Sequence, residues 1–503
     1  MKPSGRIRKF IFLAVCIVIA GIVFLGLRER NVPEGQVYMR NGKFEINGEA
    51  FHPMILNYIV AMQTDGKEVW PAAYPGYTAG YRFPYSDPDQ CLSGIDADLK
   101  LIKQLGFNGV RIVKLAEGPV RDRNTGELYI KAFTWNAQDT LLSMTDDESY
   151  TNYSYAIKQV IDLVEANAMK VILLTDLQPD NEHLMDHWKK VIEPLADEPA
   201  IMAFDMFNEP LYFDSLDRSK EDVHRIVKHW RKLMGEELPH HLFTIGLQGI
   251  RETFEWDPNI LDVDFISFHP YEYEPDQVRN EMRWYFENVD VPWIIGETSL
   301  PADNDSVPYS DQVEFATKVL QQSHACGSCG FSWWQYKDVG WGIFHSDHMG
   351  LVAMNGEIEI EGARVNTQGT PKPTVEVFQE FNPSLPRKDC VLLPNYLNYS
   401  QHTTSLLSGR LLDQDRRPIE GGVVIGWNEH WSKSFHTTSE ADGSFKLRGD
   451  FYFHHWMATA TRHSWVRNDV RPDAFLTRGK AIPEYFLGEL LLEPLPFIHP
   501  REN

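Results

Sequence analysis

The sequence has few cysteines and too few basic residues to balance its acidic ones. One cysteine pair is spaced Cys326-x-x-Cys329, but no second pair or histidine pair accompanies it, so a zinc site is not expected among the five cysteines. The pair is expected to be structural, either as a local disulfide in an exported protein or as two small buried thiols. The formal net charge of -23 argues against nucleic acid or an anionic lipid surface as a partner.

The sequence also lacks the glycine-rich phosphate-binding turn that follows the first strand of a doubly wound sheet. Instead, apolar runs of strand length alternate with segments of helical periodicity between residues 42 and 383. This alternation predicts one closed (β/α)8 barrel. The expected barrel strands are Phe51–Tyr58, Gly109–Val113, Lys170–Leu174, Ile201–Asn208, Leu242–Leu247, Asp264–His269, Trp293–Gly296 and Gly330–Gln335.

Three local features refine this prediction. Residues 42–51 alternate polar and apolar around Asn47-Gly48, which predicts a β-hairpin that closes the bottom of the barrel. Ser93 is expected to cap the helix before the second strand. Residues 63–90 are expected to form a long loop that either lines a substrate groove or is pinned to the barrel by its aromatics, which include Trp70, Tyr74, Tyr77, Tyr81 and Tyr85.

Residues 1–30 have the pattern of a signal anchor. Several basic residues precede an uninterrupted apolar run, Phe10–Leu27, which closes at Arg28. As a helix this run would be about 27 Å long, close to the thickness of a bilayer's hydrocarbon core. The basic N-terminal side predicts that everything after residue 30 lies outside the cytoplasm, in the periplasm or at the cell surface. The alternative is a cleaved signal and a secreted protein, although no cleavage motif is evident.

The chain beyond the barrel predicts a second domain. Residues 31–41 and 384–404 are expected to be linkers, and residues 405–495 contain short strands separated by turns such as Asp442-Gly443. This pattern predicts a small antiparallel β-sandwich. The order of its strands resembles that of carboxypeptidase regulatory-like, transthyretin-type domains. Such a domain either binds carbohydrate or spaces and stabilises the barrel.

Two glutamates at strand ends carry the chemistry. The run from Ile201 ends in Asn208-Glu209-Pro210, and the run from Trp293 ends in Glu297. Because the carboxyl ends of all barrel strands face one side, both side chains are expected at the same mouth. One protonated and one ionised carboxyl group are what glycosidic bond cleavage requires. A single glutamate at a strand end would more simply make a surface salt bridge, but two in this arrangement predict a retaining glycosidase.

These residues resemble clan A of the glycoside hydrolases, most closely glycoside hydrolase family 5. The resemblance runs from about Gly42 to Phe381 and rests on the motifs Leu99–Arg111, Met206–Pro210, Phe268–Tyr271, Ile294–Glu297 and Trp334. It implies that Glu209 is the acid/base and Glu297 the nucleophile. It also implies substrate-binding or positioning roles for Asn208 at the sugar 2-hydroxyl, Arg111 and Tyr271 at the nucleophile, His269 beside them, and Trp334 below the cleaved bond. Asp176 stands where the family often has a histidine, which leaves the sugar preference open.

The sequence therefore predicts a retaining β-glycosidase that cleaves a β-glycan or its oligosaccharides, with cellulase- or mannanase-like specificity. No metal or organic cofactor is expected, because carboxyl groups suffice for proton transfer and covalent catalysis. A catalytically silent carbohydrate-binding or scaffold protein is the alternative from another class, although both carboxyls are present. A transglycosylase would use the same residues and the same covalent intermediate, so this alternative stays open.

Overall fold

The computed structural model describes residues 32–497, apart from 75–80, 117, 123, 180–183, 272–274, 354–357, 361–362, 366–368, 394–401, 471–474 and 476–480. The signal anchor expected at residues 1–30 lies outside this described part of the chain. Among the residues that are described, no helix combines the length and apolar character needed to cross a bilayer.

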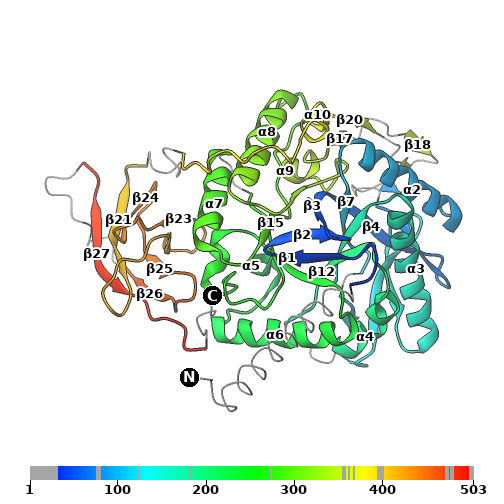
Figure 1. The fold of residues 1–503 in the computed structure, drawn as a ribbon, viewed down its shortest axis with the longest axis horizontal. Helices are drawn as coiled ribbons and strands as arrows, with labels where there is room; N and C mark the ends of the chain where they lie inside the picture. Colours follow the sequence, from blue (N-terminus) through cyan, green and yellow to red (C-terminus); the bar gives the residue numbers. More distant parts are fainter. Residues whose placement is uncertain are drawn as a thin grey trace, which may run out of the picture.

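A closed barrel of parallel strands forms the larger part of the molecule (Figure 1). Its strands are β4 (Met54–Thr64), β7 (Gly109–Val113), β11 (Lys170–Leu174), β12 (Ile201–Asn208), β13 (Leu242–Leu247), β14 (Ile266–Phe268), β15 (Trp293–Ile295) and β16 (Phe331–Trp333). Each strand pairs with the next one in this order, and β16 pairs back with β4. Nearly every strand position is buried, as expected for strands that face a packed interior and a layer of helices. The predicted barrel is therefore confirmed.

Helices surround this sheet (Figure 1). Those that alternate with the barrel strands are α2 (Pro88–Gln104), α3 (Asp147–Ala166), α4 (Met185–Ile192), α6 (Lys220–Glu237), α7 (Pro275–Asn288), α8 (Tyr309–Ala325) and α10 (Val375–Gln379). The predicted start of α2 was wrong: Asp87 caps it by accepting a hydrogen bond from the backbone N–H of Gln90. Ser93 lies inside the helix and donates to the carbonyl of Asp89. Proline at the first helical position and a capping aspartate outweigh the later serine.

The chain also forms strands and short helices outside this alternation. They are β5 (Val69–Ala73), β6 (Tyr81–Arg82), β8 (Val120–Arg121), β9 (Leu128–Phe133), β10 (Asp139–Ser143), η2 (Glu193–Leu195), α5 (Pro210–Phe213), η3 (Ile250–Phe254), α9 (Phe344–Asp347), β17 (Val352–Ala353), β18 (Ile358–Ile360), β19 (Ala363–Val365) and β20 (Thr370–Pro371). Since β5 pairs with β4, residues 63–90 are not simply a loop. Trp70 is buried there against Phe83, so it does not line a groove, and Tyr77 lies outside the described residues.

The predicted N-terminal hairpin is confirmed and gains a third strand. It consists of β1 (Val37–Arg40), β2 (Lys43–Ile46) and β3 (Glu49–Phe51). Asn47 and Gly48 have φ values of 53° and 85°, as the two-residue turn requires. Phe44 packs on residues at the N-terminal ends of barrel strands. The segment expected as a linker thus contains β1, which belongs to the cap at this end of the barrel.

The C-terminal domain is a sandwich of two sheets, seen on the left in Figure 1. One sheet has the order β24-β21-β27 and the other β23-β22-β25-β26. The strands are β21 (Ser405–Leu412), β22 (Val423–Trp427), β23 (Ser434–Thr438), β24 (Ser444–Gly449), β25 (His455–Thr459), β26 (Val466–Asp469) and β27 (Glu484–Leu491). The predicted all-antiparallel pairing was wrong at one position, because β27 runs parallel to β21.

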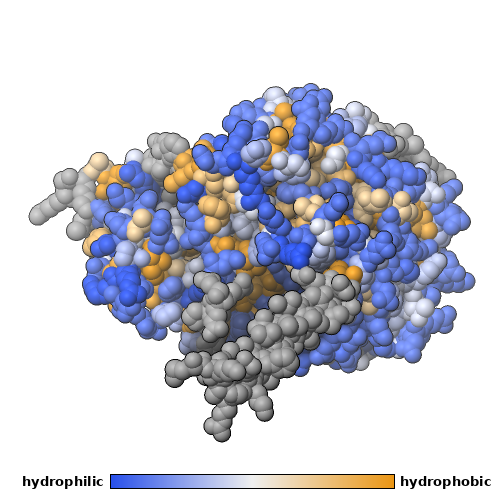
Figure 2. All heavy atoms as spheres, in the orientation of Figure 1, coloured by the Kyte–Doolittle hydropathy of each residue, from blue (hydrophilic) through white to orange (hydrophobic). Residues whose placement is uncertain are grey.

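Strand β22 is buried on both faces, one against the barrel and the other against the second sheet of the sandwich. Val423 and Ile425 join the core of the barrel, whereas Val424 points the other way into the core of the sandwich. This is the alternation of a strand buried on both faces. Figure 2 shows apolar side chains gathered where the two lobes meet. Buried polar contacts add to this interface: Lys220 bonds Asp257 of the barrel at 3.0 Å and the Thr459 hydroxyl of the sandwich at 3.0 Å.

One disulfide ties the connecting segment to the barrel. It joins Cys326 at the end of α8 to Cys390, and Cys329 is a free thiol, so a local Cys326–Cys329 bond is excluded. Cys329 donates instead to the carbonyl of Gly42. The described parts of the expected linker, residues 384–393 and 402–404, have no helix or strand, but the disulfide holds the first of them against α8.

Candidate active site

Glu209 lies where β12 ends and the short helix α5 begins. Its backbone has φ 42° and ψ 69°, in the left-handed region that residues other than glycine rarely adopt. A hydrogen bond from its backbone N–H to the carbonyl of Gly246 on β13, at 2.8 Å, fixes this turn. Such strained backbone is concentrated at functional sites, where the surrounding structure holds it.

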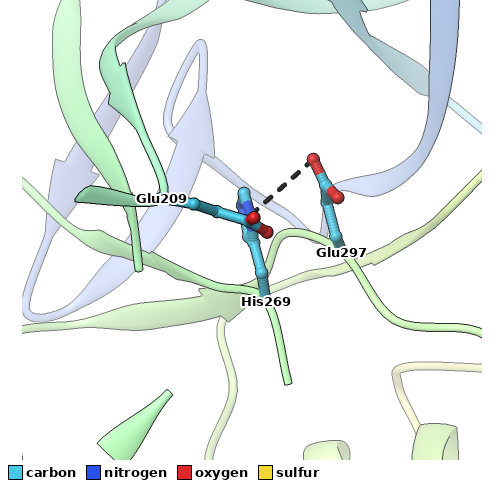
Figure 3. A group of neighbouring side chains, drawn as sticks. All are labelled: Glu209, His269 and Glu297. Atoms are coloured by element: carbon cyan, nitrogen blue, oxygen red, sulfur yellow. Dashed lines mark hydrogen bonds and ion pairs between the residues drawn. The ribbon is translucent and has the colours of Figure 1, made fainter. Parts of the chain in front are cut away.

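His269 follows β14 and lies between the two glutamates. Its Nδ1 is 3.0 Å from Oε1 of Glu209 and 3.7 Å from Oε1 of Glu297. Figure 3 shows the carboxyl groups approaching this imidazole from opposite sides. One carboxylate oxygen of each glutamate and one ring nitrogen of His269 all lie within 4.8 Å of one another. The barrel therefore brings together the two glutamates that are 88 positions apart in the chain (297 minus 209).

Two glycines make the space for His269. A Cβ at Gly246 would lie 2.6 Å from the imidazole Cε1, and a Cβ at Gly296 would lie 2.8 Å from Nε2. The Gly296 position is more restricted still, because the same Cβ would lie 1.8 Å from the hydroxyl of Ser267. Since real atoms do not approach so closely, glycine at both strand ends is a requirement of the buried ring.

Arg111 holds Glu297 from below. Its Nη1 donates to Oε1 of Glu297 at 2.5 Å and to the side-chain oxygen of Asn57 at 3.0 Å. Its Nε and Nη2 lie 2.9 and 2.8 Å from Oδ2 of Asp205, and Nη2 also donates to the Asn208 amide oxygen at 2.7 Å. Arg111 and Asp205 are both fully buried. The planar guanidinium thus fixes several strand ends in one geometry.

Tyr271 completes the surroundings of Glu297. Its hydroxyl donates to Oε2 at 3.0 Å, so the two carboxylate oxygens have different donors, Tyr271 on one and Arg111 on the other. Only 6% of Glu297 is exposed to solvent. The carboxyl group is therefore held in one orientation and is almost inaccessible to solvent.

Burial shifts the acidity of all three groups. Burial raises the pKa of Glu209 to about 7, and Arg111 opposes this rise. Burial also raises the pKa of Glu297, but His269, Arg111 and the Tyr271 hydrogen bond all act in the opposite direction. Burial lowers the pKa of His269 to about 4, so its imidazole is neutral at neutral pH. The pKa of both glutamates is thus raised above that of a free glutamate, while the donors directed at Glu297 limit the rise there.

Asn208 and Trp334 lie at the same end of the barrel. Arg111 holds the amide oxygen of Asn208, which directs the amide nitrogen away from the guanidinium. Trp334 follows β16 and packs with apolar residues of three other barrel strands, Ile59, Val113 and Leu174. It is partly exposed, whereas Trp333 is fully buried against Phe315 and Phe378 of the outer helices. The predicted split between the two tryptophans is confirmed.

The structure adds three residues that the sequence did not point out. Asn57 donates to the carbonyl of Gly296 at 2.9 Å and accepts from Arg111. Asp205 pairs with Arg111, and Glu252 accepts from the backbone N–H of Leu211, two residues after Glu209. Asp205 had a detectable signal, because a charged residue inside an apolar strand needs a buried partner.

The same three groups, Glu209, His269 and Glu297, offer atoms at a spacing that suits a metal ion. However, the Glu297 oxygen nearest to His269 also accepts from Arg111. A fixed positive charge at hydrogen-bond distance from that oxygen opposes the binding of a cation there. The arrangement fits a pair of carboxyl groups that exchange protons better than it fits a metal centre.

A parallel (β/α)8 barrel with two facing glutamates at its carboxyl mouth is the architecture of a glycoside hydrolase. A family model supports this class: residues 71–337 match cellulase (glycosyl hydrolase family 5). The chain belongs to that family.

Other comparisons are more distant. No curated protein matches the chain. A Bacteroides uniformis β-glucuronidase is 12% identical with a TM-score of 0.46, and the match covers 90% of this chain but only 48% of that one. A Streptomyces cattleya GH5_18 variant in complex with Manβ1-4GlcNAc is 14% identical with a TM-score of 0.43, covering 68% of this chain and 85% of that one. An exo-β-1,4-mannosidase from Opitutaceae bacterium strain TAV5 is 15% identical with a TM-score of 0.44, covering 70% and 61%. The assignment rests on the family model.

Proposed function

We propose that the protein hydrolyses β-glycosidic bonds with retention of configuration, with Glu297 as the nucleophile and Glu209 as the acid/base. The observation that carries this proposal is the short distance between the two carboxyl groups: one oxygen of Glu209 and one oxygen of Glu297 lie within 4.8 Å of each other. Retaining enzymes hold their carboxyl groups about 5–5.5 Å apart, whereas inverting ones need about 6.5–9.5 Å to admit a water molecule.

The proposed reaction has two steps. In the first, a carboxylate oxygen of Glu297 bonds to the anomeric carbon while Glu209 gives its proton to the departing oxygen. In the second, Glu209 removes a proton from water, and the resulting oxygen displaces Glu297 from the same carbon. Arg111 and Tyr271 hold the carboxylate in position for attack. Asn208 offers its amide nitrogen to a sugar hydroxyl, and Trp334 offers its ring to the sugar face at the cleaved bond.

The raised pKa of Glu209, about 7, suits a group that must first give and later take a proton near neutral pH. His269 supports this role because the neutral imidazole can share a hydrogen bond with Glu209 without fixing a charge beside it. A silent scaffold protein would not need this arrangement. Transfer to a sugar acceptor would use the same intermediate, and no described residue favours it over transfer to water.

The proposed substrate is a β-glycan or its oligosaccharides, with cellulase- or mannanase-like specificity. The measurement that tests the proposal is the anomeric configuration of the first product, followed by proton NMR on a panel of aryl β-glycosides and soluble β-glycans. The product is expected to be the β-anomer before mutarotation. An initial α-anomer would show inversion and overturn the proposed mechanism.

The proposed location is outside the cytoplasm, tethered to a membrane by residues 10–27 or released if this segment is cleaved. Two observations support it: the basic residues that precede the apolar run, and the Cys326–Cys390 disulfide, since such bonds form in oxidising compartments. Protease added to spheroplasts, whose outer envelope has been removed, is expected to digest the barrel while sparing a cytoplasmic marker. A barrel that is protected until the spheroplasts are lysed would contradict this location.

A further inference from the structure

The turn between β22 and β23 presents a tryptophan on the surface of the C-terminal domain. Trp431 is 52% exposed. One face of its indole stacks on the imidazole of His455, with ring centroids 4.0 Å apart and an interplanar angle of 13°. Its ring centroid lies 5.1 Å from that of Trp427, with the two rings tilted by 47°. A large aromatic side chain exposed to this extent costs hydration free energy unless something covers it.

The backbone at this position is also unusual. Trp431 has φ 57°, a left-handed conformation that is unfavourable for a bulky residue, where glycine or asparagine would be free of strain. The turn is held by Asn428, whose side-chain oxygen accepts from the N–H of Ser432 at 3.0 Å and whose carbonyl accepts from the N–H of Trp431 at 3.2 Å. A rigid turn that keeps a strained, exposed tryptophan indicates a functional position.

Three side chains in a row across the sheet support the indole of Trp431. Trp427, His455 and Asp469 are register partners across β22, β25 and β26, so their side chains leave the same face of the sheet. Nδ1 of His455 lies 2.7 Å from Oδ1 of Asp469, whose side chain is 81% exposed. Trp431 is thus a flat apolar surface stacked on an imidazole that an exposed carboxylate holds in place.

This row faces the same way as the surface that packs on the barrel. Val423, Ile425 and Trp427 alternate on one face of β22, and the first two are in the barrel core. Both β22 and β25 pack against η3, the helix that follows β13 at the carboxyl end of the barrel. Glu252 of η3 accepts from Leu211 beside the acid/base residue. The exposed ring therefore lies on the barrel-facing side of its sheet, which η3 links to the catalytic mouth.

We propose that Trp431, with His455 and Asp469, forms a second carbohydrate-binding site that holds a pyranose ring of a β-glycan chain. Equatorial pyranoses combine an apolar C–H face with hydroxyl groups around the rim. The C–H face would stack on the free side of the indole, while His455, held by Asp469, supports the other side of the ring. The site would keep a polymer near the barrel, so it concerns long substrates and not the bond-breaking step. The class of ligand rests on the proposed function.

Affinity electrophoresis of the full-length protein tests the site directly. The chain carries Glu297→Gln, so that polymer is not consumed, and migrates in gels containing hydroxyethyl cellulose, konjac glucomannan or, as a control polymer, dextran. At least one of the two β-glycans is expected to retard it, and Trp431→Ala is expected to weaken that retardation about tenfold. Trp431→Phe, which keeps a flat ring, and Asp469→Asn are expected to fall in between.

Phe486→Ala is the matched control, because Phe486 is 63% exposed on β27 of the other sheet. It should migrate like the parent chain. Equal retardation of Trp431→Ala and its parent, or no retardation of the parent by either β-glycan, would overturn the proposal. Turnover of a short aryl β-glycoside by the chain with Glu297 intact distinguishes the two proposals. If Trp431→Ala turns it over normally, the catalytic proposal stands whatever the gels show.

Discussion

Nη1 of Arg111 lies 2.5 Å from Oε1 of Glu297, and both groups are buried below the mouth of the barrel. The guanidinium is in turn held by Asp205, so a carboxylate that no substrate touches sets the position of one that we propose reacts. Replacing Arg111 therefore changes the charge beside Glu297 as well as the shape of the site.

Arg111→Met removes the positive charge beside Glu297. Because that charge lowers the pKa of Glu297 against the effect of burial, the pKa in the variant is expected to rise. The ionised form is then lost at a higher pH, so the acidic limb of the kcat/KM profile should move to higher pH. The rate should fall at least 100-fold, since removing a preorganised catalytic interaction has about that effect. An acidic limb that stays in place would separate Arg111 from the ionisation of Glu297.

Asp205→Asn tests the lower half of the same ion pair. Removing one member of a buried pair leaves the other charge poorly compensated and typically costs about 3–5 kcal/mol. Because Glu297 and Asn57 still contact Arg111, a loss at the lower end of this range is expected, seen as a lower thermal unfolding midpoint. Asp415→Asn, on an exposed turn, is the control and should leave the midpoint unchanged. Equal midpoints in both variants would show that the buried pair adds no stability.

The pKa of Glu209, about 7, predicts the alkaline limb of activity. The raised pKa favours the protonated form, which is lost as the pH rises through about 7, so kcat/KM on a substrate with a poor leaving group should fall above this pH. In Glu209→Ala the limb should disappear, and activity should survive only on aryl glycosides whose leaving group needs no proton. A wild-type profile that stays flat to about pH 9 would assign the acid to another residue.

Gly296→Ala tests the space around His269. The new Cβ would lie 1.8 Å from the Ser267 hydroxyl and 2.8 Å from the imidazole, so the ring must move away from both glutamates. We expect loss of activity and a lower unfolding midpoint. Gly235→Ala is the control: it lies in α6 with no atom within 4 Å of the new Cβ, and alanine is favoured there by about 1 kcal/mol. Unimpaired turnover by Gly296→Ala would mean that the position of His269 is not critical.

Replacing both cysteines of the disulfide tests the connection to the C-terminal domain. The bond joins residues 64 positions apart, and its loss is expected to cost about 2–4 kcal/mol. Cys326→Ser with Cys390→Ser should therefore unfold at lower temperature, whereas Cys329→Ala should resemble the parent. If Cys329→Ala proves as damaging as the double variant, Cys326 and Cys390 are not the bonded pair.

The barrel could be predicted because its signals are local. Runs such as Ile201–Asn208 are buried on both sides and read as continuous apolar segments, and their alternation with helices leaves little choice of topology. The two glutamates followed from this order, since strand ends meet at one face.

Other features depend on contacts between distant segments, which one sequence does not reveal. The spacing of Cys326 and Cys329 suggested a local bond, but the fold brings Cys390 closer. The pairing of Asp205 on β12 with Arg111 on β7 required knowing which side chains meet inside the barrel, because β11 lies between these two strands. Likewise, β27 returns parallel to β21 through a long connection, where turn signals favour antiparallel neighbours.

In the proposed mechanism, Glu297 forms a covalent bond to the sugar while Glu209 delivers the proton. Incubation with a 2-deoxy-2-fluoro β-glycosyl fluoride, followed by intact mass and peptide mapping, tests it most directly. One added fluoroglycosyl group is expected, located on the peptide that contains Glu297, with no label in Glu297→Gln. Label on a different carboxylate, in a chain that hydrolyses the parent glycoside, would contradict it.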